Sequence, residues 1–71
     1  MIINSICAMD SYLYTSGYDG TVKRWLVQDD NLKEAGEAII GPCINAICCT
    51  SANIVYAGDT NGNITRIQFN Q

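Results

Sequence analysis

The stretch that decides the fold is Ile3-Asn4-Ser5-Ile6-Cys7, because it returns 41 positions later as Ile44-Asn45-Ala46-Ile47-Cys48. A second group of residues returns at an offset of 42: Leu13-Tyr14, Gly20, Val22 and Arg24 reappear as Val55-Tyr56, Gly62, Ile64 and Arg66. One extra residue between the two groups, expected in a loop, explains the change of offset. The sequence therefore predicts two copies of one structural unit.

Each unit consists of short runs of β-favouring residues that are separated by turn residues. The runs predict strands at residues 2–8, 12–16, 21–27 and 37–40 in the first unit and at 44–49, 54–57 and 63–69 in the second. Asp19-Gly20 and Asn61-Gly62 are hairpin signals, because a tight turn requires a positive φ that Gly, Asn and Asp tolerate. The polar residues 28–36 are expected to form a loop; a helix from Asp30 is the alternative, but so short a helix ending at Gly36 is marginal in water.

A period of about forty residues with about four strands per unit is typical of β-propeller blades. The sequence thus predicts an all-β fold of two antiparallel blades: residues 1–40 form a complete four-stranded blade, and residues 41–71 form an incomplete, three-stranded one. Two blades cannot close a ring, and their outer faces would expose apolar surface. We expect the chain to be a homo-oligomer or part of a larger propeller.

The segment from Ser16 to Trp25 reads Ser-Gly-Tyr-Asp-Gly-Thr-Val-Lys-Arg-Trp. It resembles the core of a WD repeat, the Trp-Asp propeller family. The resemblance implies a hydrogen-bonded set of His, Ser/Thr, Asp and Trp in each blade; Asp19 and Trp25 match this set, with Thr15 or Ser16 as the hydroxyl. The match is degenerate, because the chain has no His, and Ile67-Gln68 stands where the second repeat should have Trp-Asp.

Two further expectations depend on this resemblance. Trp25 is expected in the core, where its replacement by Ala would cost about 3–5 kcal/mol. Arg24 and Arg66 depart from the family pattern, which usually has an apolar residue at both positions. We expect their stems to reach a rim and pair with local carboxylates; the alternative is that they meet a partner chain.

A second family is an alternative. The segments Val55-Tyr56-Ala57-Gly58 and Gly62-Asn63-Ile64 also resemble the blades of quinoprotein-type propellers, some of which are dehydrogenases. The chain would then be a fragment of a propeller enzyme. Quinone chemistry needs cofactor-binding groups from many blades, however, and this sequence does not supply that set.

Composition argues against several classes of partner. The 71 residues carry a formal net charge of −3 with only four cationic side chains, which gives no basic stripe for nucleic acid. The apolar runs are far shorter than the roughly 20 residues that cross a bilayer, and the first residues do not resemble a secretory signal. We therefore expect no nucleic-acid or membrane partner and a cytoplasmic location.

The four cysteines are Cys7, Cys43, Cys48 and Cys49. Zinc would need all four thiolates without any Cys-x-x-Cys spacing, and a disulfide is a second alternative. We favour small buried hydrophobes, because Cys7 and Cys48 occupy equivalent repeat positions. Without His, a Ser or Cys nucleophile lacks its commonest activator, so we expect no enzyme activity and no cofactor.

Propellers usually bind partners through loops on one face of the scaffold. With the expected strand order, one face gathers the candidate partner-binding residues Tyr18, Asp19, Pro42, Asp59 and Thr60. Tyr18 is the favoured anchor, because an exposed aromatic residue at a turn suits an interface; packing against the neighbouring blade is its alternative role. The sequence thus predicts a non-catalytic protein–protein interaction scaffold.

Overall fold

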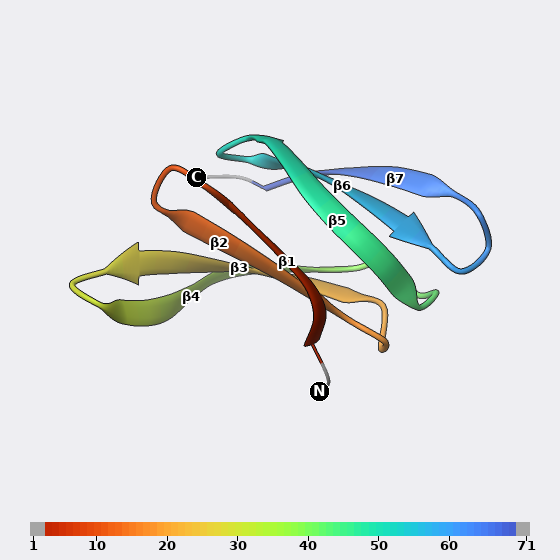
Figure 1. Ribbon diagram of the computed structural model, residues 1–71, viewed down its shortest axis with the longest axis horizontal. Coiled ribbons are helices and arrows are strands. Elements are labelled where there is room, and N and C mark those ends of the chain that lie inside the picture. Colours follow the sequence, from red (N-terminus) through yellow and green to blue (C-terminus); the bar gives the residue numbers. More distant parts are fainter. Residues whose placement is uncertain (1–2, 70–71) are drawn as a thin grey trace.

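The computed structural model describes residues 3–69, and in that range the chain is all-β (Figure 1). The strands are β1 (Ile3–Met9), β2 (Tyr12–Gly17), β3 (Thr21–Gln28), β4 (Asn31–Ile39), β5 (Ile44–Ser51), β6 (Ile54–Asp59) and β7 (Ile64–Gln68). The first sheet has the order β1-β2-β3-β4 and the second the order β5-β6-β7, both antiparallel. The prediction of an all-β chain with four and three antiparallel strands is confirmed. Ile2, the predicted start of the first strand, lies outside the described residues.

The two sheets share one pairing register. Cys7 pairs with Tyr14 in the first sheet, and the repeat equivalents Cys48 and Tyr56 pair in the second. Tyr14 in turn pairs with Arg24, as Tyr56 does with its equivalent on β7. The shift in pairing register between Ile3 and Ser5 of β1 also recurs, between Ile44 and Ala46 of β5. The sequence repeat is therefore a structural repeat.

The extra residue of the second unit lies within β5. Cys49 pairs with Val55, but the next pair joins Ser51 to Ile54, so Thr50 is left over as a bulge. The equivalent turn in the first unit has no such bulge, because Ala8 and Met9 pair with consecutive partners. A bulge accepts one extra residue without changing which side chains face each way beyond it. The prediction that this residue lies in a loop is wrong.

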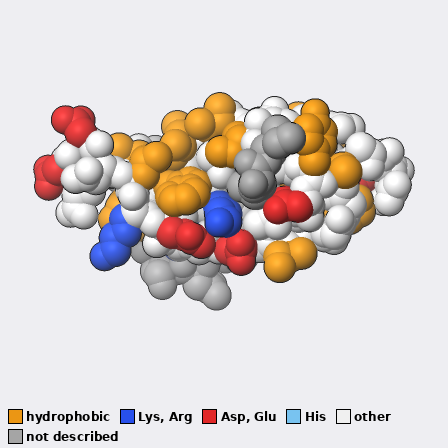
Figure 2. Space-filling view, turned by 90° about the horizontal axis from the view of Figure 1, so that it is seen from below, with side chains coloured by type: hydrophobic (Ala, Val, Ile, Leu, Met, Phe, Trp, Pro, Cys, Tyr) orange, Lys and Arg blue, Asp and Glu red, His pale blue; other side chains and the backbone are white. Residues whose placement is uncertain are grey.

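The fourth strand is longer than predicted. β4 begins at Asn31, so residues 28–36 are not a loop: Gln28 pairs with Asn31 across a two-residue turn. The turn residues Asp29 and Asp30 have φ values of 52° and 65°. Asp tolerates this left-handed conformation, and two such residues in a row suit the twist of a hairpin. The acidic side chains at the left end of Figure 2 lie where this turn is found in Figure 1.

The core lies between the sheets, where β5 packs against β1 and β2. Its buried apolar side chains come from both units: Tyr14, Val22, Ile44, Ile47, Val55, Ala57 and Phe69. Phe69 follows the last strand, and its ring lies 5.3 Å from that of Tyr14. Trp25 is not among these residues. It is half-buried and lies beside Lys23 on the opposite face of the first sheet, so its predicted place in the core is wrong.

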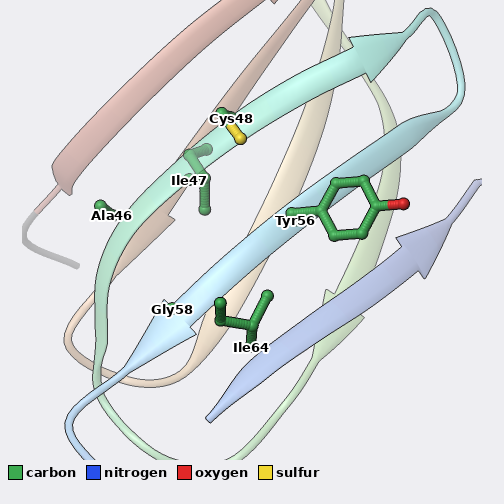
Figure 3. Close-up of a pocket in the computed structure, with 6 residues that line it drawn as sticks. All are labelled: Ala46, Ile47, Cys48, Tyr56, Gly58 and Ile64. Carbon is green, nitrogen blue, oxygen red and sulfur yellow. The ribbon is translucent and has the colours of Figure 1, made fainter. Parts of the chain in front are cut away.

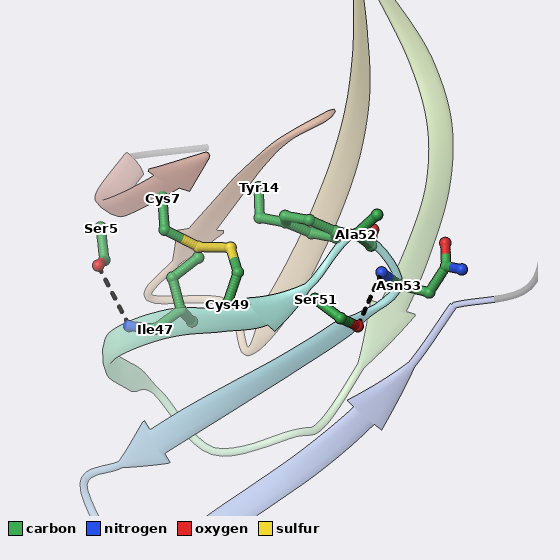
Figure 4. The surroundings of a disulfide bond; sticks show 8 residues. All are labelled: Ser5, Cys7, Tyr14, Ile47, Cys49, Ser51, Ala52 and Asn53. Atoms are coloured by element: carbon green, nitrogen blue, oxygen red, sulfur yellow. Dashed lines mark hydrogen bonds between the residues drawn. A yellow bond between two sulfur atoms is a disulfide. The ribbon is translucent and has the colours of Figure 1, made fainter. Parts of the chain in front are cut away.

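One covalent bond and several hydrogen bonds join the sheets; Figure 4 shows the disulfide and the bond between Ser5 and Ile47. A disulfide links Cys7 of β1 to Cys49 of β5, whereas Cys43 is half-buried and Cys48 is exposed. The interpretation of the cysteines as small buried hydrophobes is therefore wrong. The Ser5 hydroxyl accepts a hydrogen bond from the Ile47 amide at 3.2 Å. The side chains of Asn4 and Tyr14 donate to the carbonyls of Ile44 and Ala52, respectively.

Arg24 also bridges the sheets and is only 4% exposed. Its Nε and Nη2 donate to the Ala35 carbonyl at 3.2 and 3.0 Å, and its Nη1 donates to Asn53 Oδ1 at 3.0 Å. Ala35 is the bulged residue of β4, so its carbonyl is free to accept these bonds. The guanidinium also lies over the rings of Tyr12 and Phe69. The expectation that it reaches a rim is wrong for Arg24, whereas Arg66 is exposed.

Candidate functional site

Three loops meet at one end of the two sheets: residues 18–20 between β2 and β3, residues 40–43 between β4 and β5, and residues 60–63 between β6 and β7. We call them the loop cluster. Cys43 joins all three, because its thiol donates to the Tyr18 carbonyl at 2.9 Å and its carbonyl accepts from the Thr60 amide at 3.0 Å. A further bond runs from the Ile40 amide to the Gly20 carbonyl at 2.8 Å. The loops that carry Tyr18, Asp19, Pro42 and Thr60 are therefore neighbours, and Asp59 ends the strand that leads into the third loop.

Glycine makes the closest approach in the cluster possible. Gly20 has a φ of 80°, and a Cβ atom placed there would lie 2.6 Å from the Gly41 carbonyl oxygen. The three-residue connection ends on this left-handed glycine, which is the geometry of a type I turn followed by a bulge. Gly62 has a φ of 84° and donates to Asp59, as Gly20 does to the equivalent Gly17. Both units thus use one turn design.

The exposed side chains of the cluster form a small mixed surface. Tyr18 is 54% exposed, Asp19 and Thr60 are also exposed, and Pro42 is half-buried. The Asp19 carboxylate accepts from the Thr21 amide at 3.1 Å, which holds its own turn. An aromatic ring, a carboxylate and a hydroxyl lie on loops fixed by main-chain bonds, a combination that suits recognition of a peptide or protein surface.

Asp59 has a different place from the other four candidates. It is 7% exposed, and Oδ1 of its carboxylate accepts from the amides of Asn61 and Asn63 at 2.9 and 3.1 Å. These bonds close the turn between β6 and β7. The side chain therefore positions the loop that carries Thr60, and it presents little surface of its own.

Sequence reasoning missed Cys43, which bonds to the other two loops, and Gly41, against which Gly20 lies. Nothing in the sequence indicated that Gly20 would lie against Gly41. Within residues 3–69 no three metal-ligating side chains come together. The same residues contain no helix that could span a membrane.

A second candidate surface covers the face of the second sheet that points away from the first. This free face carries Ala46, Cys48, Tyr56, Gly58, Ile64 and Arg66. The apolar members, with Ile47, line a shallow hollow (Figure 3). Ile64 is 77% exposed, and Cys48 and Ala46 are exposed as well. An apolar hollow on a sheet face is typical of a surface that another element covers.

The first sheet has a free face too, on the side away from the second sheet. Its central residues are Ile6, Ala8, Leu13, Thr15, Lys23 and Trp25. Ile6 is 59% exposed, and Ile3, Val27, Leu32 and Ile39 are other large exposed apolar residues of this sheet. Trp25 Nε1 donates to Thr15 Oγ1 at 3.0 Å, and Lys23 lies 3.9 Å from Glu34. Seen from below, groups of apolar side chains lie next to charged ones on the surface (Figure 2).

No protein-family model matches the chain, and no curated protein or solved structure matches it either.

Proposed function

We propose that the chain is a non-catalytic protein–protein interaction scaffold. In this proposal the two sheets are WD-repeat-like propeller blades, which other chains or further blades of a longer parent protein complete. The loop cluster presents Tyr18, Asp19, Pro42 and Thr60 to a protein partner, and Asp59 holds the loop of Thr60 in place.

The observation that carries the proposal is the repeated register of the two sheets. Two meanders with the same pairing, stacked face to face, leave one unpaired face at each end of the stack. Repeat units of this kind bury their apolar faces against neighbours. Both free faces here expose large apolar side chains, among them Ile6 and Ile64. Both free faces are therefore suited to packing against a neighbouring sheet.

The hydrogen bond from Trp25 to Thr15 gives the blade interpretation a second support. A Trp–hydroxyl bond between neighbouring strands is part of the polar set that the WD-repeat resemblance implies. Of the two hydroxyls suggested by the sequence, Thr15 makes this bond, whereas Ser16 donates to Asn4. The cytoplasmic location stays a prediction, and the Cys7–Cys49 disulfide weighs against it, because cytosolic thiols are kept reduced.

A phage-displayed peptide library tests the loop cluster as a binding site. Peptides selected on the wild-type chain should bind Tyr18→Ala at least tenfold more weakly, because an exposed aromatic anchor supplies much of the energy of such contacts. Leu32→Ala is the matched control: Leu32 is 56% exposed, close to the value for Tyr18, but lies on β4 away from the cluster. A library that yields no binder, or binders indifferent to Tyr18, would contradict the proposal.

A further inference from the structure

We propose that the free face of the second sheet binds the free face of the first sheet of another copy of this chain. The contact would repeat, between chains, the contact that the two sheets make within one chain. The inference rests on the proposed scaffold function and names one partner for it. It concerns the sheet faces and does not involve the loop cluster.

The free face of the second sheet repeats the face that the first sheet buries. Through the shared register, Cys48, Tyr56, Gly58, Ile64 and Arg66 are the equivalents of Cys7, Tyr14, Ser16, Val22 and Arg24. In the first sheet Tyr14, Ser16 and Val22 are fully buried under the second sheet. In the second sheet the equivalent residues line the open hollow of Figure 3. The same docking surface is thus present on both sheets. The second sheet covers it on the first sheet, and it is open on the second.

The converse holds for the free face of the first sheet. The second sheet packs Ile47, Cys49, Val55, Ala57, Thr65 and Ile67 towards the first sheet, and their equivalents are Ile6, Ala8, Leu13, Thr15, Lys23 and Trp25. Ile47 is buried in the core, whereas Ile6 at the same position of its unit is 59% exposed. A second copy would place its Ile6 in the hollow. Each free face therefore carries residues at the positions of a face that is already covered within the chain.

The polar contacts also have equivalents. Arg24 donates to Asn53, and the equivalent of Asn53 is Ser11, so Arg66 would reach the Ser11 hydroxyl of the other copy. Asn4 donates to the Ile44 carbonyl, and Asn45 would donate to that of Ile3. One bond is lost, because Ser5 is replaced by Ala46. The contact between chains should therefore be weaker than the one within the chain.

The disulfide supplies the sharpest correspondence. Cys7 on the first sheet bonds to Cys49 on the second, with Cα atoms 6.4 Å apart. The equivalent pair between two chains is Cys48 of one copy and Ala8 of the other. A cysteine substituted for Ala8 would then face Cys48 at a distance that a disulfide spans.

Because one copy uses its second sheet and the other its first, the association is head to tail and ends in a ring or an open fibre.

Oxidative cross-linking of the Ala8→Cys variant with oxidised glutathione tests this arrangement. We expect linked dimers and higher species on a non-reducing gel, and peptide mapping should find the introduced thiol bonded to Cys48 of another chain. Adding Cys48→Ser should abolish this bond. The matched control is Glu37→Cys, which places an exposed thiol on the same face but three strands away, roughly 14 Å at the usual strand spacing. The control variant should link to Cys48 at least tenfold less.

Two solution measurements on the unmodified chain complete the test. Light scattering should show a mass above that of the monomer that rises with concentration. The emission of Trp25, the only Trp, should shift to shorter wavelength in parallel, because the free face of the first sheet becomes covered. A monomer at all concentrations, or linking of the Ala8→Cys variant no better than that of Glu37→Cys, would overturn the proposal. Peptides that still require Tyr18 would then leave the scaffold function standing, so the two failures are distinguishable.

Discussion

Tyr14 with Arg24 and Tyr56 with Arg66 are the same residue pair in the same register, yet their surroundings are opposite. Tyr14 is fully buried and Arg24 is 4% exposed, whereas Tyr56 is half-buried and Arg66 is exposed. The residue types and the Tyr–Arg pairing are the same in both sheets, so they do not set this difference. It is set by the layer above each pair, because within residues 3–69 a neighbouring sheet covers the first pair and none covers the second.

The fourth strand and the residue after the last strand add to the contrast. The Arg24 guanidinium binds the Ala35 carbonyl of β4 and lies over the ring of Phe69. A Cβ atom at Gly36 would come within 3.1 Å of that ring, so the glycine of β4 lets Phe69 pack closely. The second sheet has no such strand among the described residues. One chain thus contains a buried site and its uncovered counterpart.

The largest effect should come from truncating the two tyrosines. Tyr14→Ala should lower the free energy of unfolding by about 3–5 kcal/mol, because it removes a fully buried aromatic ring from the core. Tyr56→Ala should cost less than about 1 kcal/mol at concentrations where the chain is monomeric. Urea unfolding followed by circular dichroism measures both. Equal losses for the two variants would mean that the sheets do not differ in burial as described.

The cysteines give a second matched pair. Cys7→Ser should lower the free energy of unfolding by about 2–4 kcal/mol, since the disulfide to Cys49 closes a loop with a sequence separation of 42. Cys48→Ser, the repeat equivalent, should stay within about 0.5 kcal/mol of the wild type because Cys48 is an exposed thiol. Urea unfolding without reductant checks both values. If reductant destabilised the Cys7→Ser variant as much as the wild type, the assigned disulfide would be wrong.

The arginines form a third pair with a smaller expected difference. Arg24→Met keeps much of the stem but leaves the Ala35 carbonyl without the guanidinium, so the loss should be about 1–3 kcal/mol. Arg66→Met should change the free energy of unfolding by less than about 0.5 kcal/mol, because Arg66 is exposed. The thermal unfolding of both variants, measured at low concentration, gives the comparison. A larger loss for Arg66→Met would contradict the burial pattern.

Much of the fold was predictable because turns and alternation are local. The positions of Gly20 and Gly62 located two turns, and six of the seven strands were predicted within about two residues at each end. The start of β4 was not predicted, because Asp29-Asp30 lacks a glycine and still closes a tight turn. The bulge at Thr50 was also missed, since one added residue is equally compatible with a loop. Both errors concern backbone conformations that the residue types tolerate but do not require.

The contacts between the sheets were much less predictable than the strands. Cys7 and Cys48 occupy equivalent positions, so the repeat favoured equal roles, yet the disulfide joins Cys7 to Cys49. Cys7 faces the second sheet, whereas its repeat equivalent Cys48 faces away from the first sheet. The residue of β5 that faces Cys7 is therefore Cys49, one position after the repeat equivalent. Trp25 was assigned to the core on family resemblance, but it lies on a free face. Which face of a sheet is covered depends on the sheet that packs against it, and the sequence of one repeat unit does not show where that sheet lies.

The smallest predicted effect is the pH dependence that Tyr14 contributes to stability. Burial raises the pKa of Tyr14 above its usual value of 10.0, while its bond with Arg24 acts in the opposite direction. The phenol is thus protonated in the folded chain at a pH where the unfolded chain already ionises. The unfolded state then holds fewer protons, so the stabilisation is complete below about pH 10 and is lost as the pH rises through the folded pKa.

Subtracting the stability profile of Tyr14→Phe from that of the wild type isolates this contribution, which should decline only on the alkaline side. A difference that stays constant from about pH 7 to about pH 11, on either side of the ordinary tyrosine pKa, would show that the hydroxyl of Tyr14 is not desolvated between the sheets.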